Sequence, residues 1–395
     1  MRASRRQACR RTTIRPRVPT AGRGRTRPGR VAMPCGKRAS FSRHIAPFAI
    51  GEQQQDPAGP ARRAIPACKG RFRDGNILPV GKRQGAATNR EAKMSRAIRS
   101  ALWITLAIVV ACAPWTASRA AEARIELKGL GLLGYSALAP GKTWKDGAVL
   151  LVHGTMMHGR MDTIAHAQKA LQELGHSSLA VTLSLNVSDR RGAADCAKPQ
   201  THRQHDAVAE IAAWVAYLKA QGASDITLFG HSRGGNQALR YMLEKPDPAI
   251  RRLVLLAPAS WEEMSVAGYR DAPAGSLQKT LAEAEKLAAA GRGDDLMRDV
   301  RLMNCPSASA SANAFLSYYR DDGLMQSLDM VGRVRLPTLV VVGTMDTVTP
   351  DIPKRLRGKA GPNVKIATVD GADHFFRDLI ADEAAEHVAK FISGQ

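Results

Sequence analysis

The chain has 395 residues, with 58 Lys and Arg against 35 Asp and Glu and a formal net charge of +23. Residues 1–93 hold 23 basic and 4 acidic residues, whereas residues 121–395 hold 32 and 31, a net charge of +1. A nearly neutral C-terminal region argues against a nucleic-acid-binding enzyme domain. No apolar run reaches 18 residues, which excludes a bundle of membrane-spanning helices. Six cysteines without a CxxC pair exclude a zinc ribbon or a dense disulfide scaffold.

Residues 1–93 are rich in Arg, Pro, Gly and Ala and show neither helical nor strand periodicity. Such a composition buries too little apolar surface to fold, so a disordered basic extension is predicted. Its charge fits an arm that touches nucleic acid or anionic lipid, and equally a targeting peptide. The favoured interpretation is an over-extended gene model, because an export signal follows at Met94.

Residues 94–120 have the three parts of a secretory signal peptide. A short positive segment begins at Met94, the apolar run 101–113 follows, and Ser118 and Ala120 supply the small residues of a cleavage site. The alternatives are a short buried core helix and a lipoprotein signal in which Cys112 is acylated. We predict simple cleavage, which makes the protein exported, periplasmic or secreted, with a mature chain of residues 121–395.

Such a mature chain contains two cysteines, Cys196 and Cys305. An oxidising compartment permits one disulfide between them, and this bridge is favoured if the protein is exported. Two free thiols, or buried cysteines that act as small hydrophobic residues, are the alternative.

From residue 147 onward, apolar runs alternate with segments of helical periodicity. The predicted strands are 147–152, 179–185, 226–229, 253–256, 339–342 and 364–369, and the predicted helices are 161–174, 207–220, 236–243 and 381–392. This alternation predicts an α/β fold in which helices cover both faces of a mainly parallel sheet. The rhythm breaks at about 260–335, where a helical segment at 276–291 and a low-complexity turn at 307–312 predict a helical insertion. It is either a lid or an ordinary excursion of the packing.

A G-x-S-x-G motif, Gly230 to Gly234, lies between a predicted strand and a predicted helix. In this setting the motif is typical of a nucleophile elbow, with Ser232 as the nucleophile. The glycines are needed because the turn is tight and neighbouring backbone approaches closely. The turn also places the backbone N–H of Arg233 beside the charge that develops on a substrate oxygen.

A nucleophilic serine needs a base and an acid, which are expected downstream in the order acid, then histidine. His374 follows the last predicted strand in a glycine-containing loop, and Asp346 follows the strand before it. We predict that His374 moves the proton and that Asp346 fixes the imidazole tautomer. Asp370 and Asp373 flank the histidine and are rival acids, but they are expected to cap the loop.

A second oxyanion donor is expected in the loop after an early strand. The backbone N–H of Thr155 is well placed for this role, and Gly154 permits a close approach. His153 is predicted to brace the loop as a structural histidine. His158 and Gly159 complete the segment and are candidates for the mouth of the site.

These motifs together resemble the α/β-hydrolase fold superfamily over residues 147–392, and most of all poorly characterised bacterial exported hydrolases. The resemblance implies a mainly parallel sheet of eight strands with a cap inserted after the sixth, where 260–335 falls. It also implies that two antiparallel first strands lie within 125–142.

The loop at 186–204 and the insertion contain further candidates. His202 and His205 have the chemistry of metal ligands, but no third ligand is evident. A solvated loop before a helix that is capped by Asp206 is the favoured interpretation. The aromatic residues of the insertion either line an acyl or aromatic pocket or form the insertion's own core, which is the commoner role: Trp261, Phe315, Tyr318 and Tyr319.

The sequence therefore predicts a serine hydrolase that cleaves an ester-type bond through an acyl-enzyme. It needs no metal and no organic cofactor, and its substrate is a small-molecule acyl compound. Neither a nucleic-acid partner nor a stable membrane span is expected, and the oligomeric state is left open. Thioesterase and peptidase activities are alternatives. So is a non-catalytic exported binding protein on the same scaffold, although an intact Ser–His–Asp set argues against it.

Overall fold

The computed structural model describes residues 122–395. These residues belong to one compact unit of the chain. The predicted basic extension at 1–93 and the predicted signal peptide at 94–120, with Cys112, lie outside the described residues.

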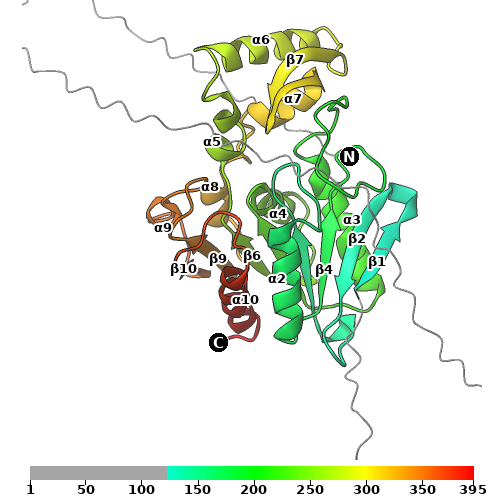
Figure 1. The fold of residues 1–395 in the computed structure, drawn as a ribbon, viewed down its shortest axis with the longest axis vertical. Helices are drawn as coiled ribbons and strands as arrows, with labels where there is room; N and C mark the ends of the chain where they lie inside the picture. The colour runs from blue at the N-terminus through cyan, green and yellow to red at the C-terminus, as the bar shows by residue number, and fades with distance from the viewer. Residues whose placement is uncertain (1–121) are drawn as a thin grey trace, which may run out of the picture. The chain divides into compact units, whose positions relative to one another are not determined.

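An eight-stranded sheet forms the centre of the described residues (Figure 1). The strand order is β1-β2-β4-β3-β5-β6-β9-β10. The β1–β2 and β2–β4 pairs are antiparallel and the other pairs are parallel, so the predicted mainly parallel sheet is confirmed. The strands are β1 (Ala123–Leu127), β2 (Leu132–Ala137), β3 (Ala148–Val152), β4 (Ser178–Thr182), β5 (Ile226–His231), β6 (Ile250–Leu256), β9 (Thr338–Gly343) and β10 (Val364–Val369).

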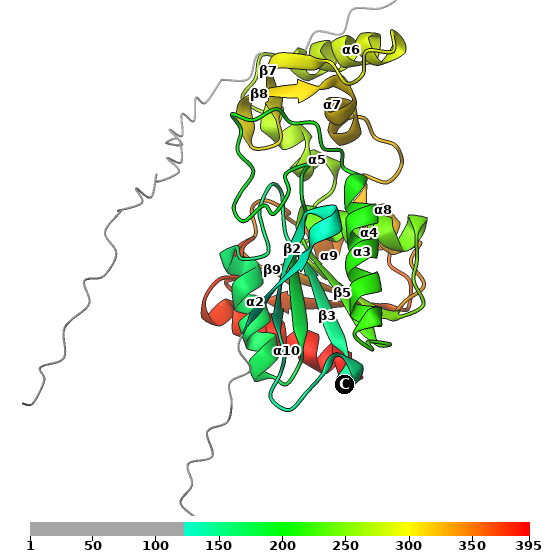
Figure 2. The same ribbon diagram turned by 90° about the vertical axis from the view of Figure 1, so that its right-hand side faces the viewer.

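Helices cover both faces of this sheet, with α2 on one side and α3 on the other (Figure 2). Alternate residues of a strand point to opposite faces. Along β3, Val149 and Leu151 join the core cluster of α2 and α10, whereas Leu150 and Val152 join that of α3 and α4. The helices outside the insertion are α2 (Asp162–Glu173), α3 (Asp206–Ala220), α4 (Arg233–Glu244), α9 (Ile352–Arg355) and α10 (Leu379–Ile392), with the 3-10 helices η1 (Lys128–Leu130) and η2 (Trp144–Asp146).

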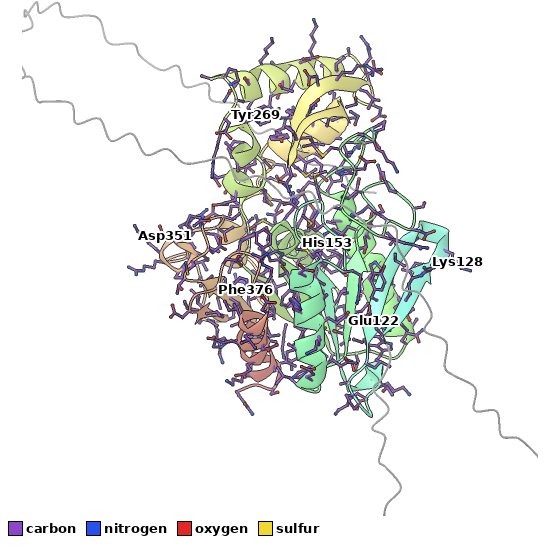
Figure 3. All side chains as sticks on the ribbon, viewed as in Figure 1. Glu122, Lys128, His153, Tyr269, Asp351 and Phe376 are labelled. Atoms are coloured by element: carbon purple, nitrogen blue, oxygen red, sulfur yellow. A yellow bond between two sulfur atoms is a disulfide. The ribbon has the colours of Figure 1, made fainter. Side chains whose placement is uncertain are left out.

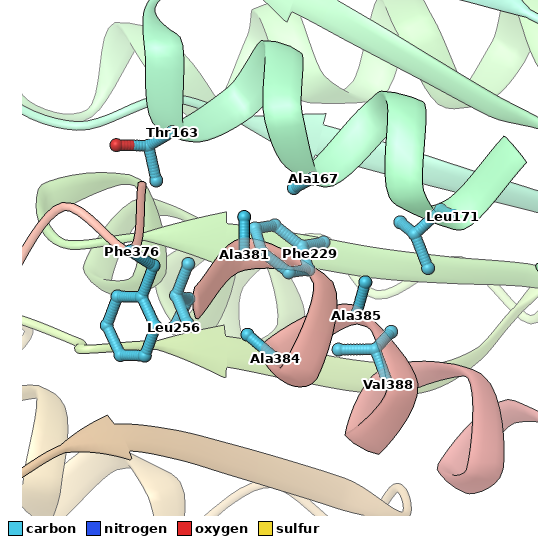
Figure 4. Close-up of a pocket in the computed structure, with 10 residues that line it drawn as sticks. All are labelled: Thr163, Ala167, Leu171, Phe229, Leu256, Phe376, Ala381, Ala384, Ala385 and Val388. Carbon is cyan, nitrogen blue, oxygen red and sulfur yellow. The ribbon is translucent and has the colours of Figure 1, made fainter. Parts of the chain in front are cut away.

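Helices α2 and α10 pack against each other and against β5 and β6 (Figure 4). Ala167 of α2 and Ala384 and Ala385 of α10 line this seam, together with Phe229 and Leu256 of the sheet. The space left between them is about 10 Å³. A volume of this size holds at most one water, so the seam is a packing contact and not a substrate site.

The chain between β6 and β9 forms the insertion, which contains Tyr269 and lies above the sheet in the view of Figure 3. Its elements are α5 (Trp261–Met264), η3 (Val266–Tyr269), α6 (Ser276–Ala289), β7 (Leu296–Leu302), β8 (Cys305–Ser311), α7 (Ala312–Tyr319) and α8 (Ser327–Val331). The predicted turn at 307–312 is wrong, since most of it is β8, paired antiparallel with β7. Ala308 and Ala310 are buried and Ser307 is exposed, the alternation of a strand with small side chains.

The long loop after β4 is attached both to the insertion and to loops at the edge of the sheet, where the N–H of Ala194 donates to the carbonyl of Met156. Cys196 in this loop forms a disulfide with Cys305 at the start of β8. Gln200 pairs with Ala310 as an additional short bridge beside the hairpin. None of the helices between residues 122 and 395 has the length and apolar character needed to cross a membrane.

Candidate active site

The predicted site residues lie where strands of the sheet end. His153 follows β3, Ser232 follows β5, Asp346 follows β9 and His374 follows β10. These four strands are parallel and belong to one sheet, so their carboxyl ends meet at the same edge. The fold therefore brings together residues that are up to 221 positions apart in the chain (374 − 153).

The turn that carries Ser232 is sterically demanding. Ser232 has φ 53° and ψ −121°, a conformation that L-residues rarely adopt. A Cβ on Gly230 would lie 2.3 Å from the carbonyl oxygen of Gly234, and one on Gly234 would lie 2.4 Å from that of His153. Both glycines are thus needed for backbone to pass this close, and the turn holds the serine side chain at the amino end of α4.

His374 bridges Ser232 and Asp346. Its Nε2 lies 2.9 Å from Ser232 Oγ, and its Nδ1 lies 2.9 Å from Asp346 Oδ2. In the neutral imidazole, Nδ1–H donates to the carboxylate and Nε2 accepts the serine hydroxyl proton. All three side chains are at most 7% exposed, so bulk water competes little for these hydrogen bonds.

Thr349 stabilises the ionised form of Asp346. The Asp346 Oδ2 atom accepts a 2.6 Å hydrogen bond from Thr349 Oγ1, and Oδ1 accepts from the N–H groups of Val348 and Thr349, both at 2.8 Å. Burial alone would raise the pKa of Asp346, but the hydrogen bond and the charge of His374, together with the bonds from Thr349, lower that pKa to about 2. The carboxylate is therefore ionised at neutral pH.

His231, inside the elbow, holds the loop that carries His374. Its Nε2–H donates to the backbone carbonyl of His374 at 2.9 Å. Burial first, and the neighbouring His374 second, lower the pKa of His231 to about 3. His231 is thus a neutral donor that fixes the backbone of His374 relative to Ser232.

The ring of His153 connects the loop after β3 to the end of β4. The Nδ1–H of His153 donates to the Gly154 carbonyl at 2.8 Å, and its Nε2 accepts from the N–H of Leu183 at 3.1 Å. Burial, reinforced by the charge of Arg190, lowers the pKa of His153 to about 3. Within residues 122–395, the backbone N–H groups of Thr155 and Arg233 have no protein acceptor, so both are available to a ligand.

A cavity of about 210 Å³ opens beside Ser232. Thioether and hydrocarbon groups dominate its wall, from Met157, Met161, Ala259, Met264, Val348 and Phe375. Met161 and Met264 are buried, whereas Val348 and Phe375 are 40% and 39% exposed, so the exposed pair marks the mouth.

The carboxylate of the cavity wall belongs to Glu263. It accepts a 2.6 Å hydrogen bond from the guanidinium of Arg355 and a 2.8 Å bond from the N–H of Ser260. Its charge is therefore balanced by Arg355 before any substrate enters.

A sequence family and several solved structures resemble this chain. The family described as Hydrolase_4, serine aminopeptidase S33, matches residues 144–377, more than half of the chain. The chain belongs to this family of α/β hydrolases. It is a hydrolase. No curated protein matches it.

Among solved structures, Est1E from Butyrivibrio proteoclasticus is 20% identical with a TM-score of 0.47 and covers 69% of this chain and 98% of its own. The monoacylglycerol lipase of Paleococcus ferrophilus is 20% identical with a TM-score of 0.47, and the coverages are 67% and 99%. DcsB in complex with a substrate analogue is 15% identical with a TM-score of 0.52, and the coverages are 69% and 99%. At these identities the likeness concerns the fold.

The other candidate site residues of the hydrolase, among them the candidate metal ligand His202 and the expected helix cap Asp206, make structural contacts. Both ring nitrogens of His202 are used, Nδ1 by the Tyr318 hydroxyl at 2.6 Å and Nε2 by Gln200 Oε1 at 2.9 Å. Residues 122–395 contain no group of three or more His, Cys, Asp or Glu side chains that could hold a metal ion. Asp206 was expected to cap α3. It is instead the first residue of that helix, and its side chain accepts from the N–H of Arg203.

The other expectations concern aromatic and acidic residues. Phe315, Tyr318 and Tyr319 are buried in the insertion's own core cluster and do not line the cavity beside Ser232. Asp370 accepts from the Thr344 hydroxyl. Asp373 accepts from the N–H groups of residues 375 and 376, so both acids fix loops and neither contacts the imidazole of His374.

Three contacts of the hydrolase site were not expected from the sequence. The segment with Thr349 had a usable signal, because an aspartate side chain often accepts from backbone N–H groups a short way downstream. His231 and Glu263 had none, since their partners His374 and Arg355 lie 143 and 92 positions away. Such pairs become visible only when the strands have been placed beside one another.

Proposed function

We propose that this hydrolase cleaves carboxylic esters of small molecules through an acyl-enzyme on Ser232. The observation that carries the proposal is the continuous hydrogen-bonded chain from Asp346 through His374 to Ser232 Oγ. A nucleophile, a base within 2.9 Å and a carboxylate that orients the base form the set required for nucleophilic acyl transfer.

In the proposed reaction, His374 Nε2 takes the hydroxyl proton as Ser232 Oγ attacks the ester carbonyl carbon. The resulting oxyanion accepts hydrogen bonds from the N–H groups of Thr155 and Arg233. The imidazolium, held by ionised Asp346, then protonates the leaving alkoxide as the C–O bond breaks. Water then attacks the acyl carbon as His374 takes its proton. The bond between the acyl carbon and Ser232 Oγ breaks, the imidazolium returns the proton to Oγ, and the carboxylic acid leaves.

The cavity favours a short, uncharged acyl group. Its volume of about 210 Å³ is below the range of about 300–1,000 Å³ typical of drug-sized ligands. An aminopeptidase must bind the ammonium group of a free N-terminus, and the acid of this wall, Glu263, is already paired with Arg355. We therefore place esters ahead of peptides, and thioesters remain an outcome of the assay.

The test is intact mass of residues 121–395 after treatment with a fluorophosphonate, with Ser232→Ala alongside. We expect a single adduct on the wild type and none on the variant. Short-chain and long-chain esters, a thioester and an aminoacyl amide then rank the substrates, with the short ester fastest. A folded wild type without an adduct contradicts the proposal and favours a non-catalytic binding protein.

We also propose that residues 94–120 are a secretory signal peptide and that the mature protein begins near Ala121 in an exported form. The Cys196–Cys305 disulfide supports this, since such bonds persist in oxidising compartments. N-terminal sequencing of the native protein tests it. A start near Ala121 is expected, a lipidated Cys112 would indicate the lipoprotein alternative, and a start at Met1 would contradict export and restore the basic extension as part of the protein.

A further inference from the structure

The side chain of Arg233, the residue after the nucleophile, is buried and contacts three separate parts of the chain. It is 3% exposed. Its Nε donates to Thr155 Oγ1 at 3.2 Å, Nη1 donates to Gln204 Oε1 at 3.0 Å, and Nη2 donates to the backbone carbonyl of Met264. The guanidinium carbon also lies 5.1 Å from the centre of the Tyr318 ring.

None of these contacts of Arg233 is a carboxylate. Burying a cation without an anionic partner is costly, and burial lowers the pKa of Arg233 to about 10. This pKa is still well above neutrality, so the group remains charged. For comparison, Arg240 is equally buried on the same helix α4 and has two acidic partners, Glu244 and Asp322. Packing alone does not explain why a guanidinium without an acidic partner is buried next to Ser232.

The partners of Arg233 are the parts that an acyl-transfer site must hold in register. Thr155 carries one of the two proposed oxyanion donors. Met264 belongs to α5 of the insertion, and its side chain forms part of the cavity wall. Gln204 is fully buried and donates to Asn236 Oδ1 at 2.9 Å, which ties the end of the long loop to α4.

The Tyr318 ring, which lies against the Arg233 guanidinium, is also held in place by hydrogen bonds. The Gln200 amide donates to the carbonyls of Asp195 and Lys198, so its Oε1 accepts from His202 Nε2–H. His202 Nδ1 consequently accepts the Tyr318 hydroxyl proton. The ring that faces Arg233 is therefore held in place by the loop that the disulfide joins to the insertion.

We infer that Arg233 is a positioning residue: its guanidinium fixes Thr155 through Oγ1 and holds it in register with Met264, so that the oxyanion donor and the acyl-binding wall keep their relative placement during turnover. This inference rests on the proposed function. It assigns the side chain of Arg233 a role separate from that of its backbone N–H.

The test compares Arg233→Met, Arg233→Lys, Thr155→Val and the Arg233→Met/Thr155→Val double variant in residues 121–395. Met keeps much of the volume without charge, and Val replaces the threonine hydroxyl by a methyl while keeping the N–H. Arg240→Met is the matched control, a buried arginine of α4 outside the site. Each protein is measured for kcat and KM on a short-chain ester, for its rate of labelling by the fluorophosphonate, and for its thermal midpoint.

We expect Arg233→Met to lower kcat and the labelling rate about 10- to 100-fold, with KM changed less than about threefold, because the loss falls on the transition state. Thr155→Val should lower both rates in the same direction, and the double variant should be no slower than the slower single variant. Arg233→Lys keeps the charge but not the fork of donors, so it should remain at least about tenfold below wild type. Arg240→Met should lower the thermal midpoint and leave kcat within about twofold.

Four results would overturn the inference. These are wild-type kcat in folded Arg233→Met, full recovery by Lys, effects of the two single variants that multiply in the double variant, or an equal loss of kcat in Arg240→Met. If Arg233→Met does not fold, Thr155→Val decides, since wild-type rates in that variant remove the link through Oγ1. A wild type that neither reacts with the fluorophosphonate nor cleaves esters overturns the proposed function itself, and this inference with it.

Discussion

Removal of the Cys196–Cys305 disulfide tests how the insertion is held. The bridge joins residues 109 positions apart, and it closes a loop that includes β5, β6 and most of the insertion. In the chain-entropy description, a loop of 109 residues corresponds to a stabilisation of about 4.8 kcal/mol at 25 °C, and measured bridges usually give about 2–4 kcal/mol. We therefore expect Cys196→Ser/Cys305→Ser to lose about 2–5 kcal/mol of unfolding free energy.

This loss converts into a change of melting temperature. A domain of about 270 residues has an unfolding entropy of about 0.57 kcal/mol/K, so the expected decrease is about 4–9 °C. Differential scanning fluorimetry of residues 121–395 at pH 7 measures it. Intact mass must first show that the bridge has formed in the wild type, which then lacks the two thiol hydrogens. Cys305 is buried, so reductant reaches the bridge slowly.

The Cys196→Ser single variant is the matched control, since either substitution removes the whole bridge and both variants should melt together. Identical melting of an oxidised wild type and the double variant would refute the chain-entropy reasoning. A much larger decrease would point instead to local contacts of the bridge, such as that between Cys305 Sγ and Met156 Sδ at 3.9 Å.

Three further changes follow from the site geometry. Asp346→Asn should retain the fold and lower kcat on a short-chain ester about 10⁴-fold, because the amide favours the wrong tautomer of His374; a decrease below tenfold would argue against Asp346 as the orienting acid. Because the folded-state pKa of Asp346 is lowered from 3.8 to about 2, its ionisation stabilises the fold above about pH 4 and ceases to do so as the pH falls towards 2. The difference in melting temperature between wild type and Asp346→Asn should change over that window, and a constant difference from pH 5 to pH 2 would refute the assignment. Gly234→Ala places a Cβ 2.4 Å from the His153 carbonyl oxygen and should lower the melting temperature by about 5 °C or more, whereas Gly192→Ala, with nothing within 4 Å of its Cβ, should melt like wild type.

The residues at the strand ends could be predicted because the segments next to them in the chain have recognisable sequence patterns. Ser232 and Asp346 both follow a strand that is buried on both faces, and such strands appear as continuous apolar runs. A right-handed parallel arrangement then requires the carboxyl ends of these strands to share one edge. Neither step needs knowledge of side-chain contacts.

The insertion was harder to predict because its signals are weak and depend on partners. In β8, alanine and serine alternate, and such small side chains carry little strand propensity of their own. What makes the segment a strand is β7 on one side and the single bridge of Gln200 on the other. The pairing of Cys196 with Cys305 belongs to the same arrangement, since both cysteines lie where the long loop meets the hairpin.

The contacts of Arg233 show most clearly which features of the site could not be predicted from the sequence. Its three hydrogen-bond partners lie 78, 29 and 31 positions away, in a strand-end loop, a long irregular loop and the insertion. Within the motif, Arg233 occupies the position between the serine and the second glycine, where the elbow requires only a backbone N–H. The motif therefore leaves the side chain free to vary with the surroundings that a given chain builds. In this hydrolase the surroundings are an insertion and a loop joined by a disulfide, and an arginine is the side chain whose fork of donors reaches both of them and Thr155 at once.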